Sequence, residues 1–416
     1  MGVAFSTFQN NSYRRQRREA PGIAEGKWTY PRQRELLAMT DLPALTSLRF
    51  FAAAMVVLVH IQGSFGVPAL PGWNLNVGVS LFFTLSGFIL TYQYPALPTR
   101  QDRKTFYWKR FARIWPAHIV AALLVLLIVP NAMDLPPAEK ALAFVTNALM
   151  VQTWVPVAWV GYSINGPSWS ISTECFFYLM FPLLILNFDR TWWWKLALSF
   201  GVIVVLACLF ELVIDRADPH RGASIFRIFY VYPEVRIFEF IGGMVAALAW
   251  RRWSEHLRFS VAAATVIEAA AVVCFVLFLD VGIWQTLVVG ESVTNLHPLV
   301  NLLLMSGAAV VPGGALIFAL SLGRGLISRA MSLPLLVVLG EMSYAIYLLH
   351  ATLLRAYEAN PQRFSDVSPA LMLAAFVAAL LLLSWALFNF VERTARRAIL
   401  ARTGAPVALA DSQASA

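Results

Sequence analysis

Long apolar runs recur along this chain and limit what it can fold into. The runs cover about residues 44–63, 77–95, 114–130, 171–188, 196–214, 228–250, 260–283, 298–322, 333–353 and 369–391. Each is long enough, or nearly so, to cross a membrane core, which takes about 20 helical residues. Charged residues make up 13% of the 416 residues, whereas soluble domains have about 25%. The sequence therefore predicts an all-α fold, a polytopic bundle of about ten transmembrane helices.

Basic residues mark the ends of these runs and predict their orientation. Residues 100–113 hold six Lys or Arg and one Asp, whereas the loop 62–76 carries no charge. Because Lys and Arg collect in cytoplasmic loops, both termini and the loop 96–113 are expected in the cytoplasm. The net charge of +9 then marks topology and does not indicate a nucleic-acid partner.

The apolar stretch 141–154 is the ambiguous segment. It is short for a span and carries Asn147 and Gln152. If it crossed the membrane, every later loop would invert, and the basic clusters 251–258 and 393–397 would lie outside. The charge bias favours an excursion of residues 131–170 at the outer face.

The segments outside the apolar region are short and basic. We expect a cytoplasmic tail over 1–43, a membrane domain over 44–392 and a second cytoplasmic tail over 393–416. Any chemistry is then expected inside the bundle of a multi-pass protein of the cell (inner or plasma) membrane.

Ionisable side chains inside apolar runs are costly and so become candidates for function. Arg49 and His60 lie 11 residues apart, about three helical turns, which places them on one face of a helix. The imidazole could act as a general base. It could equally hydrogen-bond a neighbouring helix, with Arg49 as a cytoplasmic anchor.

Two further polar clusters lie at predicted span ends. Arg110 and Arg113 share a helix face among aromatic residues, which suits either a phosphate-rich ligand or a topology anchor. The serines of the stretch 168–172 could cap the fourth predicted span. That explanation accounts less well for Glu174, since apolar residues surround it.

The remaining candidates lie in later spans. Arg236 and Glu239 can pair within one helix, and we favour a structural role for them. His350 lies in the outer half of its predicted span, as do His60 and Glu174. Within the sequence we find no P-loop, Rossmann turn, zinc site or nucleophile elbow. The residues alone fit either proton-coupled transport or acyl transfer.

Four stretches together resemble the acyltransferase-3 family of integral membrane O-acyltransferases. Arg49 and His60 stand at its R-x10-H spacing, and residues 77–88, VGVSLFFTLSGF, resemble its second helix. Residues 110–116, RFARIWP, and 169–178, WSISTECFFY, resemble two further family motifs. The resemblance covers about 44–392, and the order and spacing of the motifs make it specific.

The resemblance implies ten membrane helices and an enzyme. It implies transfer of an acyl group, usually acetyl from acetyl-CoA, to a hydroxyl of an extracytoplasmic or lipid-linked glycan. His60 would be catalytic, with Arg49 essential and Glu174 at the reaction centre, while Arg110 and Arg113 would hold the CoA phosphates. Cys175 stands where many relatives have a second acid, which weakens any mechanism that needs paired carboxylates there.

From these expectations we assemble a candidate site. Acyl-CoA would dock from the cytoplasm, and Glu174 would orient His60, which acts either as a base or as a transient acyl carrier. Acceptor binding is assigned to Ser168, Trp169, Ser172, Arg236, Glu239, Tyr347 and His350.

The expected partners are a lipid bilayer, a glycan or lipid-linked oligosaccharide and proteins of polysaccharide biosynthesis, with acyl-CoA as donor substrate. No metal or tightly bound cofactor is expected. The alternative function is a transporter of a lipid-linked sugar or of a proton-coupled solute, and a further one is a non-catalytic scaffold.

Overall fold

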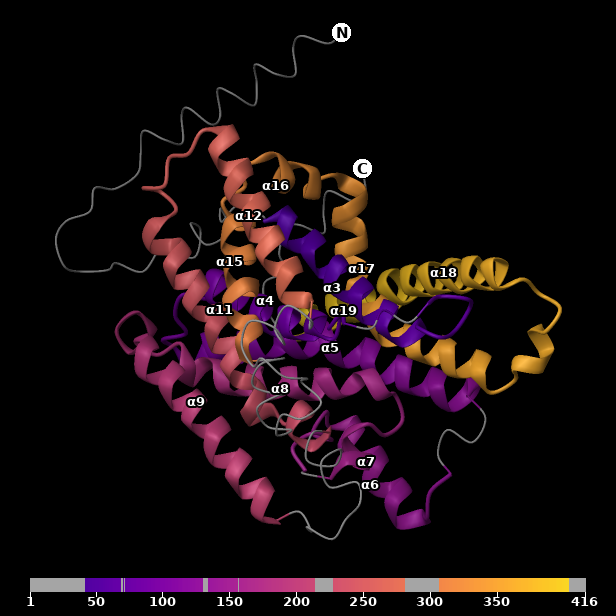
Figure 1. Cartoon of the computed structure of the whole chain (residues 1–416). Helices are drawn as coiled ribbons and strands as arrows, with labels where there is room; N and C mark the ends of the chain where they lie inside the picture. Colours follow the sequence, from indigo (N-terminus) through magenta and orange to yellow (C-terminus); the bar gives the residue numbers. More distant parts are fainter. Residues whose placement is uncertain are drawn as a thin grey trace. The chain divides into compact units, whose positions relative to one another are not determined.

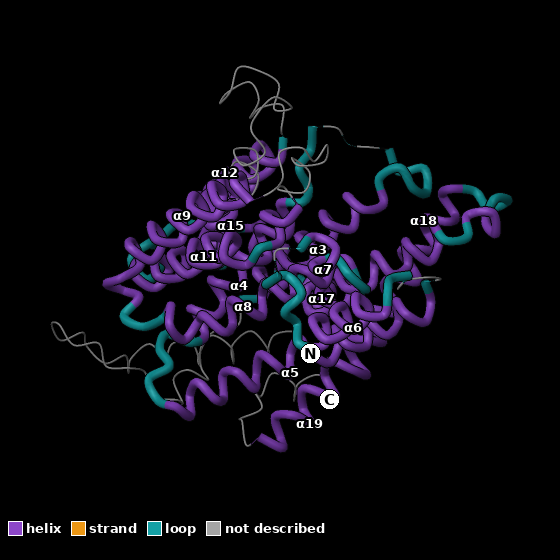
Figure 2. Tube along the Cα trace, turned by 90° about the horizontal axis from the view of Figure 1, so that it is seen from below, coloured by secondary structure: helices purple, strands orange, loops and turns teal. Residues whose placement is uncertain are grey.

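The computed structural model describes residues 42–68, 70, 72–129, 134–155, 157–213, 227–280 and 307–403. Most of the expected tail 1–43 and the end of the expected tail 393–416 lie outside these ranges. Within them, helices carry the fold, and the one β-pairing is an isolated bridge between Trp73 and Asp280 (Figures 1 and 2). The predicted all-α class is confirmed.

The described α-helices are, in chain order, α3 (Pro43–Ile61), α4 (Val77–Gln93), α5 (Arg100–Ile128), α6 (Pro137–Ala148), α7 (Ala158–Gly161), α8 (Trp169–Leu184), α9 (Phe188–Val213), α11 (Pro233–Trp253), α12 (Val261–Leu279), α15 (Val310–Ser321), α16 (Leu326–Met331), α17 (Pro334–Glu358), α18 (Pro369–Ala386) and α19 (Arg393–Thr403). A π-helical segment, η6 (Leu387–Glu392), joins α18 to α19. Short 3-10 turns are η1 (Gly166–Ser168), η4 (Gly307–Ala309) and η5 (Pro361–Phe364).

Six described helical stretches are long and apolar enough to cross a membrane: Pro43–Ile61, Arg100–Ile128, Phe188–Phe210, Val261–Leu279, Pro334–Glu358 and Pro369–Thr403. The other four predicted spans correspond to α4, α8, α11 and α15. These helices are shorter or, in α11, carry more charge. The multi-pass architecture is confirmed, while the count of ten and the sides of the termini stay predictions.

The start of α5 corrects one expectation. Thr99 and Asp102 form a capping box: the Thr99 hydroxyl accepts from the Asp102 amide at 3.0 Å, and Asp102 Oδ2 accepts from the Thr99 amide at 3.0 Å. This cap starts the helix at Arg100, because two otherwise unpaired backbone amides are satisfied there. The predicted loop 96–113 is therefore helical from Arg100 onward, whereas the expectation that Arg110 and Arg113 lie on a helix agrees with α5.

The ambiguous segment 141–154 contains a helix end and a turn. The 12 residues of α6 end at Ala148, so this helix is about 18 Å long and too short to cross a membrane core. The Trp115 indole donates to the Ala148 carbonyl at 3.0 Å, which ties the end of α6 to α5. This geometry favours the expected excursion over an additional span.

Close helix packing surrounds the interior polar residues. α4 packs most extensively on α11, and α3 on α17. A side chain at Gly87 would collide with the Phe240 carbonyl, and one at Gly243 with the Thr84 carbonyl. The two glycines thus let the backbones of α4 and α11 touch, as expected for small residues between membrane helices.

Candidate active site

A large cavity lies where α3 ends and where α4 and α8 begin, beside the C-terminal half of α17. Its volume is about 860 Å³. Aromatic rings line it together with amide, hydroxyl and carboxylate groups, including Asn76, Asp134, Trp159 and Tyr162. In the predicted topology this end of the bundle faces outward. Its mixed lining suits a ligand with both apolar faces and hydroxyl groups.

His60 lines this cavity and is an exposed side chain. Its Nδ1 lies 2.8 Å from the carbonyl oxygen of Val56, one turn earlier in α3. Because a carbonyl oxygen can only accept, Nδ1 carries the hydrogen, so that in the neutral ring the lone pair is on Nε2. The helix thus fixes the tautomer that a general base or nucleophile needs.

A second imidazole stands against His60. The rings of His60 and His350 are 4.9 Å apart between centroids, at an interplanar angle of 63°. His350 is fully buried, and its Nδ1 lies 2.6 Å from the Tyr347 carbonyl. The prediction that these two histidines share one half of the bundle agrees with their contact.

A narrower cavity of about 60 Å³ lies deeper in the bundle. Arg49 and Arg113 line it, together with Ser86, Glu174 and Tyr344. Arg110 and Arg113 lie close enough to Arg49 to repel it, and the nearby Glu174 carboxylate attracts Arg49 and Arg110. Three guanidinium groups around one carboxylate give this region a positive charge suited to an anion.

Glu174 occupies a different place from the one the sequence suggested. Its Oε1 accepts hydrogen bonds from the Ser86 hydroxyl at 3.0 Å and from the Tyr178 hydroxyl at 2.5 Å. It lines the narrow cavity, whereas His60 lines the large one. Across the described residues no hydrogen bond joins Glu174 to His60, so the expected orienting contact is absent there.

Arg110 and Arg113 also differ from each other. The Arg110 guanidinium is buried among the rings of Tyr94, Phe106 and Tyr178, at 5.7, 5.9 and 5.8 Å from their centroids. Arg113 lines the narrow cavity directly. Of the two predicted phosphate ligands, therefore, the geometry favours Arg113, and Arg110 lies behind it.

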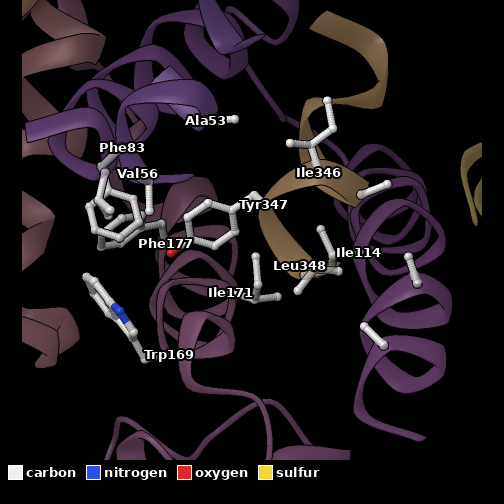
Figure 3. Packing of buried hydrophobic residues seen from close by; sticks show 14 of the residues in the cluster. Ala53, Val56, Phe83, Ile114, Trp169, Ile171, Phe177, Ile346, Tyr347 and Leu348 are labelled. Carbon is white, nitrogen blue, oxygen red and sulfur yellow. The ribbon is translucent and has the colours of Figure 1, made fainter. Parts of the chain in front are cut away.

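Val79 and Tyr347 line both cavities and so form a wall between them. The Tyr347 hydroxyl accepts a hydrogen bond from Ser170 at 2.9 Å. Figure 3 shows the Tyr347 ring close to Val56, Phe83 and Ile171, in the packed centre of the bundle. Tyr347, expected to bind the acceptor, therefore lies in the wall between the two cavities.

Arg236 and Glu239 lie behind the wall of the large cavity. They form a buried ion pair, with Nη2 of Arg236 at 3.1 Å from Oε2 of Glu239. Nη2 also donates to the Ser80 hydroxyl at 3.2 Å, and the guanidinium lies 4.9 Å from the centroid of Tyr230 and 5.9 Å from that of Trp169. Neither charged residue lines a cavity among those described, which favours the structural role.

Three residues of the serine-rich block have separate places. Trp169 lines the large cavity. Ser172 accepts from the Thr153 amide and hydroxyl at 3.2 and 2.8 Å, while Ser168 accepts from Gln152 and donates to the Asn165 carbonyl. These two serines hold the loop that follows α6 against α8, and they do not line the described cavities. Their placement disfavours the expected acceptor binding.

Sequence reasoning missed most of the large cavity's polar lining. Asn74 and Asn76 precede α4, and Asp134, Trp159 and Tyr162 come from the predicted outer excursion. The sequence feature that could have predicted this lining is the placement of the charge-free loop 62–76 and the aromatic residues of 131–170 on the same predicted side. Within the described ranges, no group of three or more His, Cys, Asp or Glu side chains is placed to hold a metal ion.

Comparison with known proteins matches most of the described helices to one family. A family model described as an acyltransferase domain matches residues 42–389. Acyltransferase MdmB of Streptomyces mycarofaciens is 31% identical over 333 residues, which are 76% of this chain and 79% of that protein. No solved structure matches the chain.

Two further relatives match this chain less completely. Peptidoglycan O-acetyltransferase OatA of Listeria monocytogenes is 27% identical over 74% of this chain, a match that spans 49% of OatA. Nodulation protein 10 of Rhizobium leguminosarum bv. viciae is 27% identical over 50% of this chain and 60% of its own length. With the family model matching nearly all of the described helices, this chain belongs to the acyltransferase-3 family.

Proposed function

We propose that this protein transfers an acyl group, in the simplest case acetyl, from acyl-CoA to a hydroxyl of an extracytoplasmic or lipid-linked glycan. The observation that carries the proposal is the Nε2 lone pair of His60 in a cavity of about 860 Å³ with aromatic and amide groups. A glycan acceptor is further supported by the Listeria relative, which is a peptidoglycan O-acetyltransferase. The protein would work in the cell membrane beside enzymes of polysaccharide synthesis.

The donor side of the proposal rests on the arginines. Arg49 and Arg113 line the narrow cavity, and Arg110 adds a third positive charge. Phosphates of acyl-CoA would bind at this cluster, because guanidinium groups form strong paired hydrogen bonds with phosphate oxygens. The slender pantetheine arm would extend into the narrow cavity toward Tyr347.

His60 can support two routes. As a general base, its Nε2 would take the acceptor's hydroxyl proton while the oxygen attacks the thioester carbonyl carbon. As a nucleophile, the same atom would carry the acyl group briefly and then pass it to the acceptor. Incubation with radiolabelled acetyl-CoA in the absence of acceptor separates the routes, because only the second leaves label on the protein.

The test uses purified protein in lipid nanodiscs and the glycans of cells with and without the chain. We expect His60→Ala to lower acyl transfer by about 100- to 10,000-fold, the usual contribution of a general base. His256→Ala is the matched control, because His256 is exposed in the turn after α11. Undiminished transfer by His60→Ala would exclude both routes, and solute transport without acyl-CoA binding would establish a transporter instead.

A further inference from the structure

His60 on α3 and His350 on α17 are in contact, and each bonds a backbone carbonyl of its own helix. Their ring centroids are 4.9 Å apart. Nδ1 of His60 lies 2.8 Å from the Val56 carbonyl, and Nδ1 of His350 lies 2.6 Å from the Tyr347 carbonyl. Both Nδ1 atoms therefore donate, so that in the neutral form of each ring the lone pair is on Nε2. The two rings in contact thus use the same nitrogen to bond the backbone.

The His350 lone pair is unusual because it is buried. The side chain is fully enclosed, and Nε2 has no hydrogen-bond partner within the described ranges. Buried polar atoms almost always have a partner, so an exception in contact with a catalytic candidate calls for a functional explanation. His60, in contrast, is exposed to the large cavity.

Other titratable or charged side chains face the same cavity, namely Asp134, Tyr162, Tyr230, Tyr347, Arg355 and Glu358. Arg355 donates to the Ile164 carbonyl at 2.8 Å, and Tyr347 is engaged by Ser170. Glu174, the carboxylate expected to serve His60, is held by Ser86 and Tyr178 at the other cavity. The side chain whose ring contacts His60 is His350.

Resting on the acyl transfer proposed above, we propose that His350 is a positioning residue that works with His60 as a two-imidazole base. The pair binds a single proton: His60 takes it, and the lone pair and ring of His350 stabilise the resulting cation. A second positive charge beside the first is costly, so the two rings in contact take up one proton between them.

The bond changes balance in this scheme. The acceptor's O–H bond breaks, its proton moves to Nε2 of His60, and its oxygen forms a bond to the thioester carbonyl carbon. The carbon–sulfur bond then breaks, and the proton passes from His60 to the CoA sulfur to give the free thiol. His350 forms no bond to substrate and acts only through His60.

Two replacements of His350 separate the proposed role from a structural one. In His350→Asn the amide nitrogen can still donate to the Tyr347 carbonyl, but nothing replaces Nε2. In His350→Gln the amide oxygen reaches farther and offers an acceptor near the Nε2 position. His256→Asn, in the exposed turn after α11, is the control for a histidine outside the cavities.

For His350→Asn we expect kcat to fall by about 10- to 100-fold with an unchanged KM for acetyl-CoA. The acid limb of the kcat/KM pH profile should move to lower pH by about one unit, because the His60 cation is less stabilised. His350→Gln should recover part of kcat. An acid limb that stays in place in a folded His350→Asn variant would overturn the proposal.

Titration of ¹⁵N-histidine signals in the wild-type protein gives a second, activity-independent readout. Both rings should respond at one shared midpoint, with one proton taken up by the pair. Two independent midpoints would overturn the shared proton even if the variants do not fold. If the wild type transfers no acyl group, the proposed function fails, while this titration still decides the inference.

Discussion

Some buried charged residues of this bundle lie behind the walls of the site and do not line its cavities. The Arg236–Glu239 pair is an example, since it lies outside the cavity while its guanidinium stacks near Trp169 and Tyr230, which line it. Removing one member of a buried ion pair leaves the other charge uncompensated. The guanidinium of the pair thus packs beside two aromatic rings that a ligand in the cavity would contact.

Replacement of Arg236 tests this role. Arg236→Met should lower the free energy of unfolding by about 3–5 kcal/mol, because Glu239 is left buried and unpaired. The double replacement Arg236→Met with Glu239→Leu should recover most of that stability, measured by thermal unfolding in nanodiscs. If stability recovers but acceptor binding does not, the pair has a direct role in binding and the structural explanation is incomplete.

The sequence identifies residues better than it identifies their neighbours. His60 and Arg49 follow from the cost of burying charge in apolar runs, and both line cavities. Glu174 and Ser172 also stand out in the sequence, but their partners do not. Partners depend on the rotation of α8 against α4 and on how the loop after α6 folds back, and neither can be obtained from the residues of one helix.

Among the helices, α4 and α11 show the tightest constraint. The backbone of each occupies the space where a side chain of the other would lie, at Gly87 and Gly243. This contact holds Ser80 on α4 beside Arg236 on α11, at 3.2 Å. The glycines are thus part of how the cavity wall is built.

A pair of glycine replacements tests the close approach. Gly243→Ala should destabilise the protein by about 1–3 kcal/mol, because the added methyl group overlaps the Thr84 carbonyl. Gly201→Ala in α9 is the control, since no atom lies within 4 Å of the place that its methyl group would take. That change should be neutral or stabilise by about 0.5–1 kcal/mol, and equal effects at the two sites would contradict the packing argument.

Helix positions follow well from hydropathy, and helix starts less well. Each of the ten apolar runs overlaps a described helix. The basic residues before the third run resemble a loop in the sequence, although the Thr99–Asp102 capping box makes them helical. The positive charge of this segment indicates its side of the membrane but not its secondary structure, because basic residues occur equally in a loop or at a helix end.

At the scale of the whole molecule, the two cavities lie in opposite halves of the predicted topology. His60 lies near the end of α3 and Arg49 nearer its start. The large cavity then belongs to the predicted outer side and the arginine cluster to the predicted inner half. A donor made in the cytoplasm and an acceptor outside would approach from opposite faces.

Cysteine labelling tests that orientation. The native cysteines Cys175, Cys208 and Cys274 are first replaced, and a single cysteine is then introduced at Gln362 or at Glu255, both exposed. We expect a membrane-impermeant maleimide to label Gln362→Cys on intact cells, and Glu255→Cys only after permeabilisation. The reverse pattern would invert the topology and separate the large cavity from an external acceptor.

The wall at Val79 and Tyr347 also bears on the energetics of the cell. A continuous polar channel through a protein of this kind would conduct protons and ions and dissipate the membrane potential, worth about 2.3 kcal/mol per charge for each 100 mV. In the proposed reaction only the pantetheine arm and its acyl group would have to pass this wall, and the charged CoA phosphates would stay at the arginines. The membrane would then stay closed to ions while the acyl group is transferred from a donor on one side to an acceptor on the other.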